Sequence, residues 1–280
     1  MEVNNKTQEN EENLDFFSPT DDYMFKLLFG TEQGSEQLTD LLGSVLELSA
    51  EEYEEITIVD PHLPREYKDS KLGVLDVTVR TKSGRLIDVE IQVKPSPELR
   101  ERVAFYGAKM LSRQIKSGDN HIKIKPVIVI LITDHILVPE SDKYHERNLI
   151  CNPETGLIFT DILEIHTIEL PKIPTMGDDT QLWWWAKFLS ARNKEEMNML
   201  AQQNQQIGKA VVRYMELSAD ERTRMIMESR QKREWDNQAR EKKVSDDRAT
   251  LIARNLKGMG LPFEQIAEGT GFTIDEINDL

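Results

Sequence analysis

The stretch LDVTVRTKSGRLIDVEIQVK, residues 75–94, alternates apolar and polar residues on both sides of a short loop. Alternation with a period of two is typical of β-strands that bury one face. The loop, Lys82 to Gly84, has three residues and ends in glycine. Such loops commonly connect hairpin strands, because glycine adopts the left-handed conformation at little steric cost. The stretch therefore predicts a β-hairpin.

The loop length sets the register of this hairpin. Counting back from the loop pairs Thr81 with Arg85, Arg80 with Leu86, Thr78 with Asp88 and Asp76 with Glu90. Directly opposed side chains have Cβ atoms about 4.5–5.5 Å apart, and like charges there are destabilising. A divalent cation would relieve that repulsion, and Mg²⁺ commonly takes one or two carboxylates together with water or phosphate oxygens. The hairpin thus predicts a metal site at Asp76 and Glu90, with Gln92 and Lys94 on the same face.

Two alternatives stay open for the hairpin. Many hairpins carry Asp, Thr, Glu, Gln and Lys on a face that meets solvent, so the two acids could be ordinary surface residues. A two-residue loop, which is the commonest type, would change the pairing and separate the acids.

The composition is that of a soluble globular chain. Its 280 residues, 39% hydrophobic and 30% charged, suffice for one large or two modest domains. The formal net charge of −15 argues against binding nucleic acid by bulk electrostatics, so such binding would need a local basic strip. Cys151 is the only cysteine, which excludes an internal disulfide and fits a reducing compartment. With no signal-peptide pattern and no apolar run of bilayer length, we expect a cytoplasmic protein with no membrane partner.

The order of predicted elements indicates an α/β fold for residues 16–175, after an acidic tail at 1–15 that we expect to be disordered. A continuous Val, Ile and Leu run at 126–133 is typical of a strand buried on both faces. Helices are predicted at 18–30, 36–46 and 97–116, and strands at 56–59, 75–80, 86–94, 126–133 and 164–170. This order favours a mixed sheet flanked by helices.

The chain beyond residue 175 is predicted to be helical. Residues 176–258 form a charged helical region, in which the run Arg222 to Lys243 alternates basic and acidic residues, as is typical of a solvated helix face and occasionally of an oligomer seam. The three tryptophans at 183–185 are expected to pack against the first domain rather than stack on bases, because adjacent helical residues point in different directions. Residues 259–280 predict a pair of helices, the second opening with a capping box. Acidic residues on that second helix favour a structural or protein-contacting pair over a DNA-reading helix-turn-helix.

Several of these motifs together resemble one known family. They are the opening TDDYMFKLLFG at 20–30, Asp76, the Glu90-Ile91-Gln92 triplet, Arg102 with Tyr106, and the closing stretch at 260–277. In their order and spacing they resemble the Rpn family of recombination-promoting nucleases and transposase-related proteins, within the PD-(D/E)XK superfamily. The resemblance covers most of the chain from residue 16.

The resemblance implies a restriction-endonuclease-like fold and a metal-dependent DNA endonuclease linked to recombination or mobile elements. It implies that Asp76, Glu90 and the backbone carbonyl of Ile91 hold Mg²⁺ or another divalent cation such as Mn²⁺. Gln92 stands where lysine usually offers a positive charge to the phosphate, whereas glutamine donates only a neutral hydrogen bond. The residue that stabilises this charge is therefore left unidentified.

Lys94 and Lys26 are candidates for that positive charge, although an ordinary solvent-exposed lysine is the commoner explanation for each. Asp22 matches the first-helix acid of the superfamily, or is a carboxylate favoured at a helix N-terminus by the helix dipole. Arg102 and Tyr106 begin a stripe at helical spacing along which the phosphates of bound DNA could lie, or which is only a solvated helix face.

Three readings of the function follow. The first is the endonuclease, with DNA as partner and with a homodimer as a further expectation, since nucleases that cut duplexes often pair two sites. The second, motivated by Gln92 and the acidic net charge, is a catalytically inactive binding or assembly module of the same fold. The third makes the C-terminal helices a DNA-binding regulator, with the first domain as a sensor.

Overall fold

The computed structural model describes residues 16–46, 56–59, 77–115, 118, 120, 124–177 and 179–280. The chain forms two compact units, Met1–Asp220 and Glu221–Leu280. The helices between residues 176 and 220, which the sequence assigned to the charged helical region, belong to the first unit together with the sheet.

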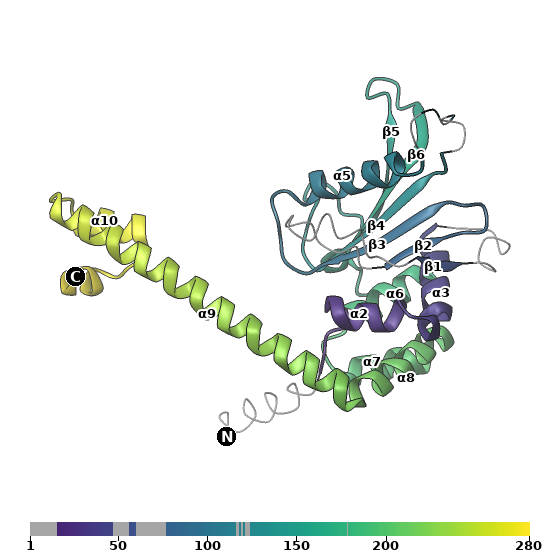
Figure 1. Cartoon of the computed structure of the whole chain (residues 1–280). Coiled ribbons are helices and arrows are strands. Elements are labelled where there is room, and N and C mark those ends of the chain that lie inside the picture. The colour runs from purple at the N-terminus through teal and green to yellow at the C-terminus, as the bar shows by residue number, and fades with distance from the viewer. Residues whose placement is uncertain are drawn as a thin grey trace. The chain divides into compact units, whose positions relative to one another are not determined.

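The first unit is built on a mixed six-stranded sheet with the strand order β1-β2-β3-β4-β6-β5 (Figure 1). β3 and β4 are parallel, as are β4 and β6, whereas the pairs β1–β2, β2–β3 and β5–β6 are antiparallel. The strands are β1 Thr57–Val59, β2 Val77–Arg80, β3 Leu86–Gln92, β4 Val127–Thr133, β5 His145–Cys151 and β6 Ile158–Glu169. The expected α/β class with a mixed sheet is therefore confirmed.

The β2–β3 hairpin has the predicted loop and register. The Thr81 amide donates to the Arg85 carbonyl at 3.0 Å, and the Gly84 amide donates to the Thr81 carbonyl at 2.9 Å. Gly84 has a φ of 89°, which is the left-handed conformation that glycine adopts most easily. The Cα partners of the ladder are Arg80 with Leu86, Val79 with Ile87, Thr78 with Asp88 and Val77 with Val89. The alternative of a two-residue loop is thus wrong.

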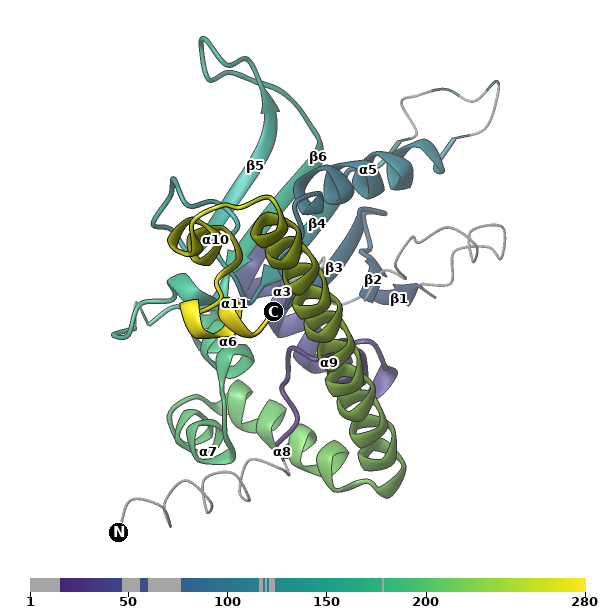
Figure 2. The ribbon, with the colours of Figure 1, turned by 90° about the vertical axis from the view of Figure 1, so that its left-hand side faces the viewer.

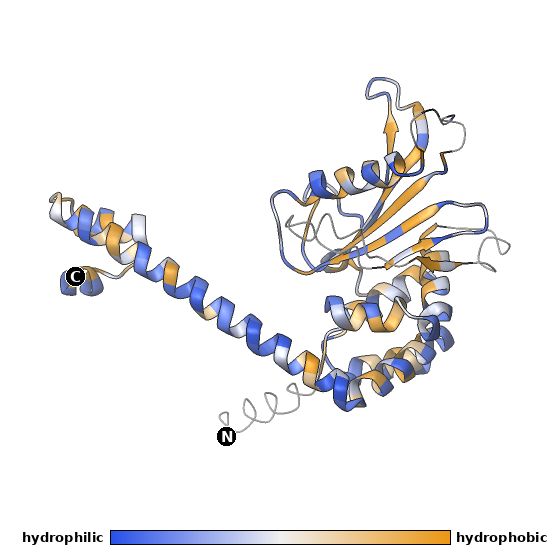
Figure 3. Ribbon diagram, viewed as in Figure 1, coloured by the Kyte–Doolittle hydropathy of each residue, from blue (hydrophilic) through white to orange (hydrophobic). Residues whose placement is uncertain are grey.

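Helices cover both faces of the sheet (Figures 1 and 2). One face lies under α5, Leu99–Ser112, whose buried residues Leu99, Val103, Tyr106 and Met110 pack with the β4 residues Val127, Val129 and Leu131. The other face is covered by α2 (Asp22–Phe29), α3 (Ser35–Leu46) and α6 (Gln181–Ser190). Every residue of β4 is buried, as the continuous apolar run predicts, and the central strands are mostly hydrophobic in Figure 3.

The close approach of α5 to the sheet depends on one glycine. A Cβ atom added at Gly107 would lie 2.6 Å from Leu163 Cδ1 of β6 and 3.4 Å from Val129 Cγ2 of β4. A Cβ atom this close would require the Leu163 side chain to move, so the glycine lets α5 pack tightly on the sheet. Gly107 also shows that this flank of α5 faces β6.

Three boundaries differ from the sequence expectations. β5 was not predicted, because its sequence HERNLIC carries four polar residues and it is the edge strand with both sides partly exposed. β6 begins at Ile158 rather than at residue 164, since its outer half pairs with β5. α5 ends at Ser112, and the chain turns at Arg113 and Gln114.

The helical part of the first unit packs as predicted around its tryptophans. Trp185 is fully buried, lies against Phe29 with ring centroids 5.6 Å apart, and donates from Nε1 to Asp40 at 2.7 Å. Trp183 is also buried. Two further helices, α7 Lys194–Gln203 and α8 Gln205–Ala219, follow α6 in this unit. Packing inside the unit, rather than base stacking, explains the tryptophans.

The second unit begins with the long helix α9, Glu221–Gly258, which is mostly hydrophilic (Figure 3). α10, Phe263–Thr270, and α11, Ile274–Asp279, form the predicted helical pair, with Gly271 left-handed between them. The predicted capping box is present at Thr273 and Glu276. Ala253, Ile266 and Ile277 form the small core of these three helices. Across the described ranges of both units, no helix is long and apolar enough to span a bilayer.

Candidate active site

Glu90 lies near the end of β3 and its side chain points to the α5 face of the sheet. In the parallel ladder, Asp88, Glu90 and Gln92 are the partners of Val129, Leu131 and Thr133 on β4. Residues paired in this way project to the same face. Because Val129 and Leu131 pack with α5, the three polar residues lie on the α5 side as well.

The polar face of the hairpin is buried. Asp88 is 0% exposed, Glu90 5% and Thr78 7%. The alternative of a solvent-facing strand with ordinary surface acids is therefore wrong for Glu90. Thr78 Oγ1 donates to Asp88 Oδ1 at 3.0 Å, which satisfies part of the hydrogen-bonding capacity of the Asp88 carboxylate. Burial of carboxylates costs free energy unless opposite charge or hydrogen bonds compensate it, so two buried acids on one face are unusual for a surface that only packs.

The partner predicted for Glu90 lies just beyond the described part of β2. The described register ends at the Val77–Val89 pair, and Asp76, the next residue, lies outside the described residues. The expected opposition of Asp76 and Glu90 therefore stays a prediction. It is supported by the described pairs between the loop and Val77, which all have the predicted register.

The hydrogen bonds of β3 show where the carbonyl of Ile91 points. The Leu86 amide donates to Pro126, and the Gln92 carbonyl accepts from Asp134, so even-numbered residues bond toward β4. The Arg85 carbonyl accepts from Thr81, so odd-numbered residues bond toward β2. Successive backbone groups of a strand point to opposite sides, which directs the Ile91 carbonyl toward the β2 side. This is the side on which the predicted metal ligand Asp76 would follow Val77.

Arg102 lies on the flank of α5 that faces β3. The sheet-facing residues of α5 include Val103 and Tyr106, and Gly107 marks the flank over β6. At about 100° per residue, Arg102 falls on the opposite flank, over the β3 side. Its side chain is half-buried. Arg102 is therefore the predicted DNA contact that shares a face with Glu90.

Tyr106, the second predicted DNA contact on α5, lies in the core. Its side chain is 3% exposed and belongs to the core cluster between α5 and β4. This core position explains the ring of Tyr106 by packing, and its role as a DNA contact stays a prediction. The helical spacing that placed it in a basic stripe also fits a core position, and the core interpretation is the one observed.

Asp22 and Lys26 lie on α2, which approaches the other face of the sheet. A Cβ atom at Gly30, the C-cap of α2, would lie 3.2 Å from Val77 Cγ2, and Val77 pairs with Val89 on the face opposite Glu90. Lys26 is one turn before Gly30, and Asp22 about 12 Å before it along the helix axis. Glu90 and Gln92 thus lie on the α5 face, whereas the Gly30 end of α2 meets the other face. Lys94 is exposed just beyond β3.

A comparison with protein families identifies the group to which this fold belongs. Residues 19–243 match the model described as PD-(D/E)XK nuclease family transposase. The chain belongs to this family. The PD-(D/E)XK transposase match covers α2, the sheet and most of the helical region that follows, and the narrower resemblance to the Rpn family stays a prediction. Searches of curated proteins and of solved structures gave no match.

The family match agrees with the fold. A six-stranded mixed sheet with helices on both faces and helices after it is consistent with a PD-(D/E)XK fold. Nucleases of this superfamily typically use divalent metals. Within the described ranges, no group of three or more His, Cys, Asp or Glu side chains could hold a metal ion. Of the three predicted ligands, only Glu90 and Ile91 lie in those ranges, and their oxygen atoms are donors of the kind that Mg²⁺ prefers.

Two of the five histidines form a buried chain on β5 and β6, outside this site. His166 Nε2 donates to Glu164 Oε1 at 2.5 Å, and His145 Nε2 lies 2.8 Å from His166 Nδ1. Arg147 holds Glu164 with two hydrogen bonds. Burial lowers the pKa of His145 to about 4, with the neighbouring His166 adding to the effect. Burial also lowers the pKa of His166, against the effect of its hydrogen bond to Glu164.

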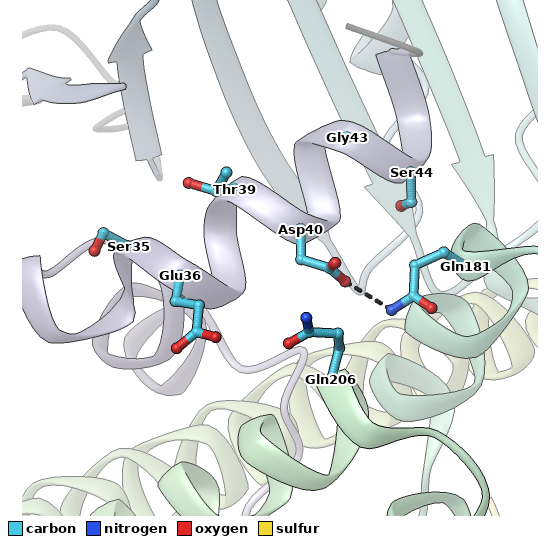
Figure 4. A pocket seen from close by; sticks show the side chains of 8 residues that line it. All are labelled: Ser35, Glu36, Thr39, Asp40, Gly43, Ser44, Gln181 and Gln206. Atoms are coloured by element: carbon cyan, nitrogen blue, oxygen red, sulfur yellow. Dashed lines mark hydrogen bonds between the residues drawn. The ribbon is translucent and has the colours of Figure 1, made fainter. Parts of the chain in front are cut away.

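A separate pocket of about 580 Å³ lies among α3, α6 and α8 (Figure 4). Its carboxylate Asp40 accepts from Gln181 Nε2 at 2.6 Å and from Trp185 Nε1 at 2.7 Å. Gln181 in turn accepts from Asn204 at 2.8 Å. Because these donors already hold the acid, Asp40 serves to join α3 to α6 and is not a free catalytic group.

Sequence reasoning missed Asp88, the second carboxylate on the buried face of β3. The signal was present, since Asp88 and Glu90 occupy alternate positions of the same strand. The sequence left open whether this face meets solvent or binds a metal, and only the packing of α5 shows that the face is buried.

Proposed function

We propose that this PD-(D/E)XK family protein is a divalent-metal-dependent DNA endonuclease linked to recombination or mobile elements. The observation that carries the proposal is the burial of Glu90 on the α5 face, one register step beyond the last described pair of a hairpin whose loop and pairing match the prediction. The family match supports the same reaction class.

The proposed metal ligands are the carboxylates of Asp76 and Glu90 and the backbone carbonyl of Ile91. Continuing the register by one residue would oppose Asp76 to Glu90, and the Ile91 carbonyl points toward the same side. When bound, a divalent cation supplies polarisation of the scissile phosphate and a lower pKa for the attacking water. Carboxylate and carbonyl oxygens suit Mg²⁺ and Mn²⁺.

The other residues of the site bind and orient the DNA. Gln92, two residues beyond Glu90 on the same face, donates a neutral hydrogen bond to a phosphate oxygen. Arg102, on the β3 flank of α5, supplies the positive charge that lysine gives in related sites. Lys94 offers a second, more exposed contact to the phosphate backbone. Asp22 and Lys26, on α2, stay predictions as a further acid and a further cation of the site, although the Gly30 end of α2 approaches the opposite face of the sheet.

A plasmid-nicking assay with Mg²⁺ or Mn²⁺ tests the proposal. Wild type is expected to convert supercoiled plasmid to open-circular or linear forms, and Asp76→Asn and Glu90→Gln are expected to lose the activity. Glu154→Gln, which alters an exposed carboxylate in the turn between β5 and β6, is the matched control and should cleave like wild type. Equal cleavage by wild type and both site variants would identify a contaminant and end the proposal.

The inactive binding or assembly module is the second candidate, favoured by Gln92 and by the net charge of −15. Calorimetric titration with Mg²⁺ separates the two functions. Binding at millimolar or lower concentration that is lost in Asp76→Asn supports the nuclease. No detectable binding, together with no cleavage, would favour the module.

A further inference from the structure

A second cavity lies on the α5 face, beside the proposed active site. Its volume is about 250 Å³, smaller than the roughly 300–1,000 Å³ common for drug-sized ligands. Its apolar walls come from α5, β4, β6 and the loop after β4: Val103, Leu131, Ile165, Leu137 and Val138. We call this cavity the base pocket.

The polar residues of the base pocket are Arg100, Glu146, Asn148 and Thr167. Arg100 and Glu146 bring opposite charges to the two sides of the cavity, from α5 and from β5. Asn148 donates from Nδ2 to the Ile165 carbonyl at 3.1 Å, which leaves its Oδ1 as an acceptor. The cavity therefore combines aliphatic walls with hydrogen-bond donors and acceptors.

The loop wall of the base pocket is held in place from three sides. Glu169 Oε2 accepts from the amides of Leu137 and Val138, at 2.7 Å and 3.3 Å. Lys172 Nζ donates to the Val138 carbonyl at 2.6 Å and pairs with Glu169 at 2.9 Å. Arg100 Nη2 donates to the Leu137 carbonyl. A wall fixed by backbone hydrogen bonds is a preformed feature rather than a loose surface loop.

Thr167 is the observation that points to a ligand. Its side chain is 6% exposed, and within the described structure its Oγ1 is buried without a hydrogen-bond partner. Thr167 pairs with Leu131 on one side and with Glu146 on the other, so its side chain is on the α5 face, where the pocket lies. Nearly all buried polar groups have a partner, which makes an orphan hydroxyl in a cavity wall a candidate ligand contact.

The base pocket lies a short distance from Glu90 across the sheet. Glu90, Leu131 and Thr167 are consecutive partners on β3, β4 and β6. Neighbouring strands are about 4.8 Å apart, so Thr167 is about 10 Å from Glu90. Both lie toward the carboxyl ends of the parallel strands, where ligands of α/β sheets usually bind, and Arg100 and Val103 of α5 line the pocket. DNA held at Glu90 would therefore have a neighbouring nucleotide within reach of the pocket.

We propose that the base pocket binds an unpaired guanine of the DNA strand, next to the phosphate that is cut; this inference rests on the proposed function. The cavity is of a size for one base, and its apolar walls can pack against the faces of a purine ring. The Glu146 carboxylate accepts from the N1 and N2 hydrogens of guanine, the only base edge that offers two adjacent donors to one carboxylate. The Thr167 hydroxyl and the remaining nitrogens of Arg100 donate to O6 and N7.

The test measures binding of short labelled single-stranded oligonucleotides to the full-length protein, with EDTA present so that no metal-dependent cleavage occurs. Each probe is a run of thymidines with one central guanine, adenine, cytosine or thymine. Wild type is expected to bind the guanine probe about tenfold more tightly than the thymine probe, the size of one or two net hydrogen bonds.

Variants of the pocket carry the discriminating result. Thr167→Val and Glu146→Gln are expected to bring the ratio of guanine to thymine affinity close to one. Thr167→Ser keeps the hydroxyl and is expected to keep the preference, which a merely structural role of Thr167 would not require. Glu154→Gln again serves as the control. The ratio, rather than the affinity itself, reports the pocket, because a partly unfolded variant would lose affinity for all four probes together.

The outcomes separate this inference from the proposed function. Plasmid cleavage without any base preference, or with a preference unchanged in Thr167→Val and Glu146→Gln, overturns the base pocket and leaves the nuclease standing. A guanine preference that depends on Thr167 in a protein that cuts no DNA supports the pocket and removes the nuclease. A preference for another base, or no binding to any probe, overturns the assignment.

Discussion

The two faces of the central sheet differ in what they bury. On the side of α2, strands β2, β3 and β4 present only valine and isoleucine: Val77, Val79, Ile87, Val89, Ile91, Ile128, Ile130 and Ile132. On the α5 side the same strands bury Thr78, Asp88, Glu90 and Thr133 among apolar neighbours. Both faces are closed to solvent, but only one carries buried charge. The α2 face is therefore a purely apolar packing surface, and the proposed active site lies on the α5 face.

The largest effect should follow from changing Glu90 on the α5 face. Glu90→Gln keeps the shape and removes the charge, so metal-dependent nicking is expected to fall by about 100- to 1,000-fold. The circular dichroism spectrum and cooperative unfolding should be retained, since a buried charge is lost and no cavity is made. Unaltered nicking in this variant would show that the two faces do not divide chemistry from stability.

A change on the α2 face should do the reverse. Ile130 is fully buried there and pairs with Val89. Ile130→Ala is expected to lower the free energy of unfolding by about 2–5 kcal/mol through lost burial and the cavity left behind. Denaturant titration measures the loss, and the nicking rate per folded molecule should stay near that of wild type. A large fall in that rate at full folding would contradict the comparison.

A smaller effect is expected from the flank of α5. Arg102→Ala should reduce nicking about tenfold and weaken its dependence on salt, because one charged contact to phosphate is lost. Arg113→Ala is the matched control, since Arg113 lies about 16 Å further along the same direction, beyond the end of α5. Equal effects of the two substitutions would mean that α5 contributes only diffuse positive charge.

The smallest effect concerns the histidine chain of β5 and β6. The pKa of His145 is lowered to about 4 in the folded protein, so the unfolded chain takes up a proton first as the pH falls below the ordinary value of 6.5. Stability should therefore decrease from pH 6.5 toward pH 4. The pKa of Glu164, held down by Arg147 and His166 against its burial, adds its loss only below about 4.5.

Thermal melts at pH 7 and pH 5 measure this effect. His145→Gln removes one titrating ring and should flatten the decrease between the two values, while Cys151→Ser, at an exposed position of the same strand, should not. An identical decrease in wild type and His145→Gln would show that this ring does not control the acid stability.

Much of this fold could be predicted from local sequence patterns. The glycine at position 84 and the alternation around it fixed the hairpin register, and the Thr273–Glu276 capping box fixed the start of α11. The burial of β4 followed from its unbroken apolar run. These features depend on a few neighbouring residues, which is why sequence reasoning reached them.

Features that depend on contacts between distant segments could not be predicted from the sequence. β5 has no apolar run and forms because β6 offers it an edge. Tyr106 fits a polar stripe and a core position equally well by spacing, and the approach of α5 to β4 decides for the core. Residues of α5, β4, β5 and β6 line the base pocket, so no single stretch of sequence predicts it. Of the site itself, Glu90 and Gln92 were placed on the predicted face, and Asp76 lies outside the described residues.

The account depends on a divalent cation at Glu90, and a crystal structure grown with Mn²⁺ tests it most directly. Anomalous diffraction should show one strong peak within about 2.0–2.3 Å of a Glu90 carboxylate oxygen, with an Asp76 oxygen and the Ile91 carbonyl as further ligands. A Glu90 side chain with no anomalous peak near it at saturating Mn²⁺, or an Asp76 side chain on the opposite face of the hairpin, would contradict the account.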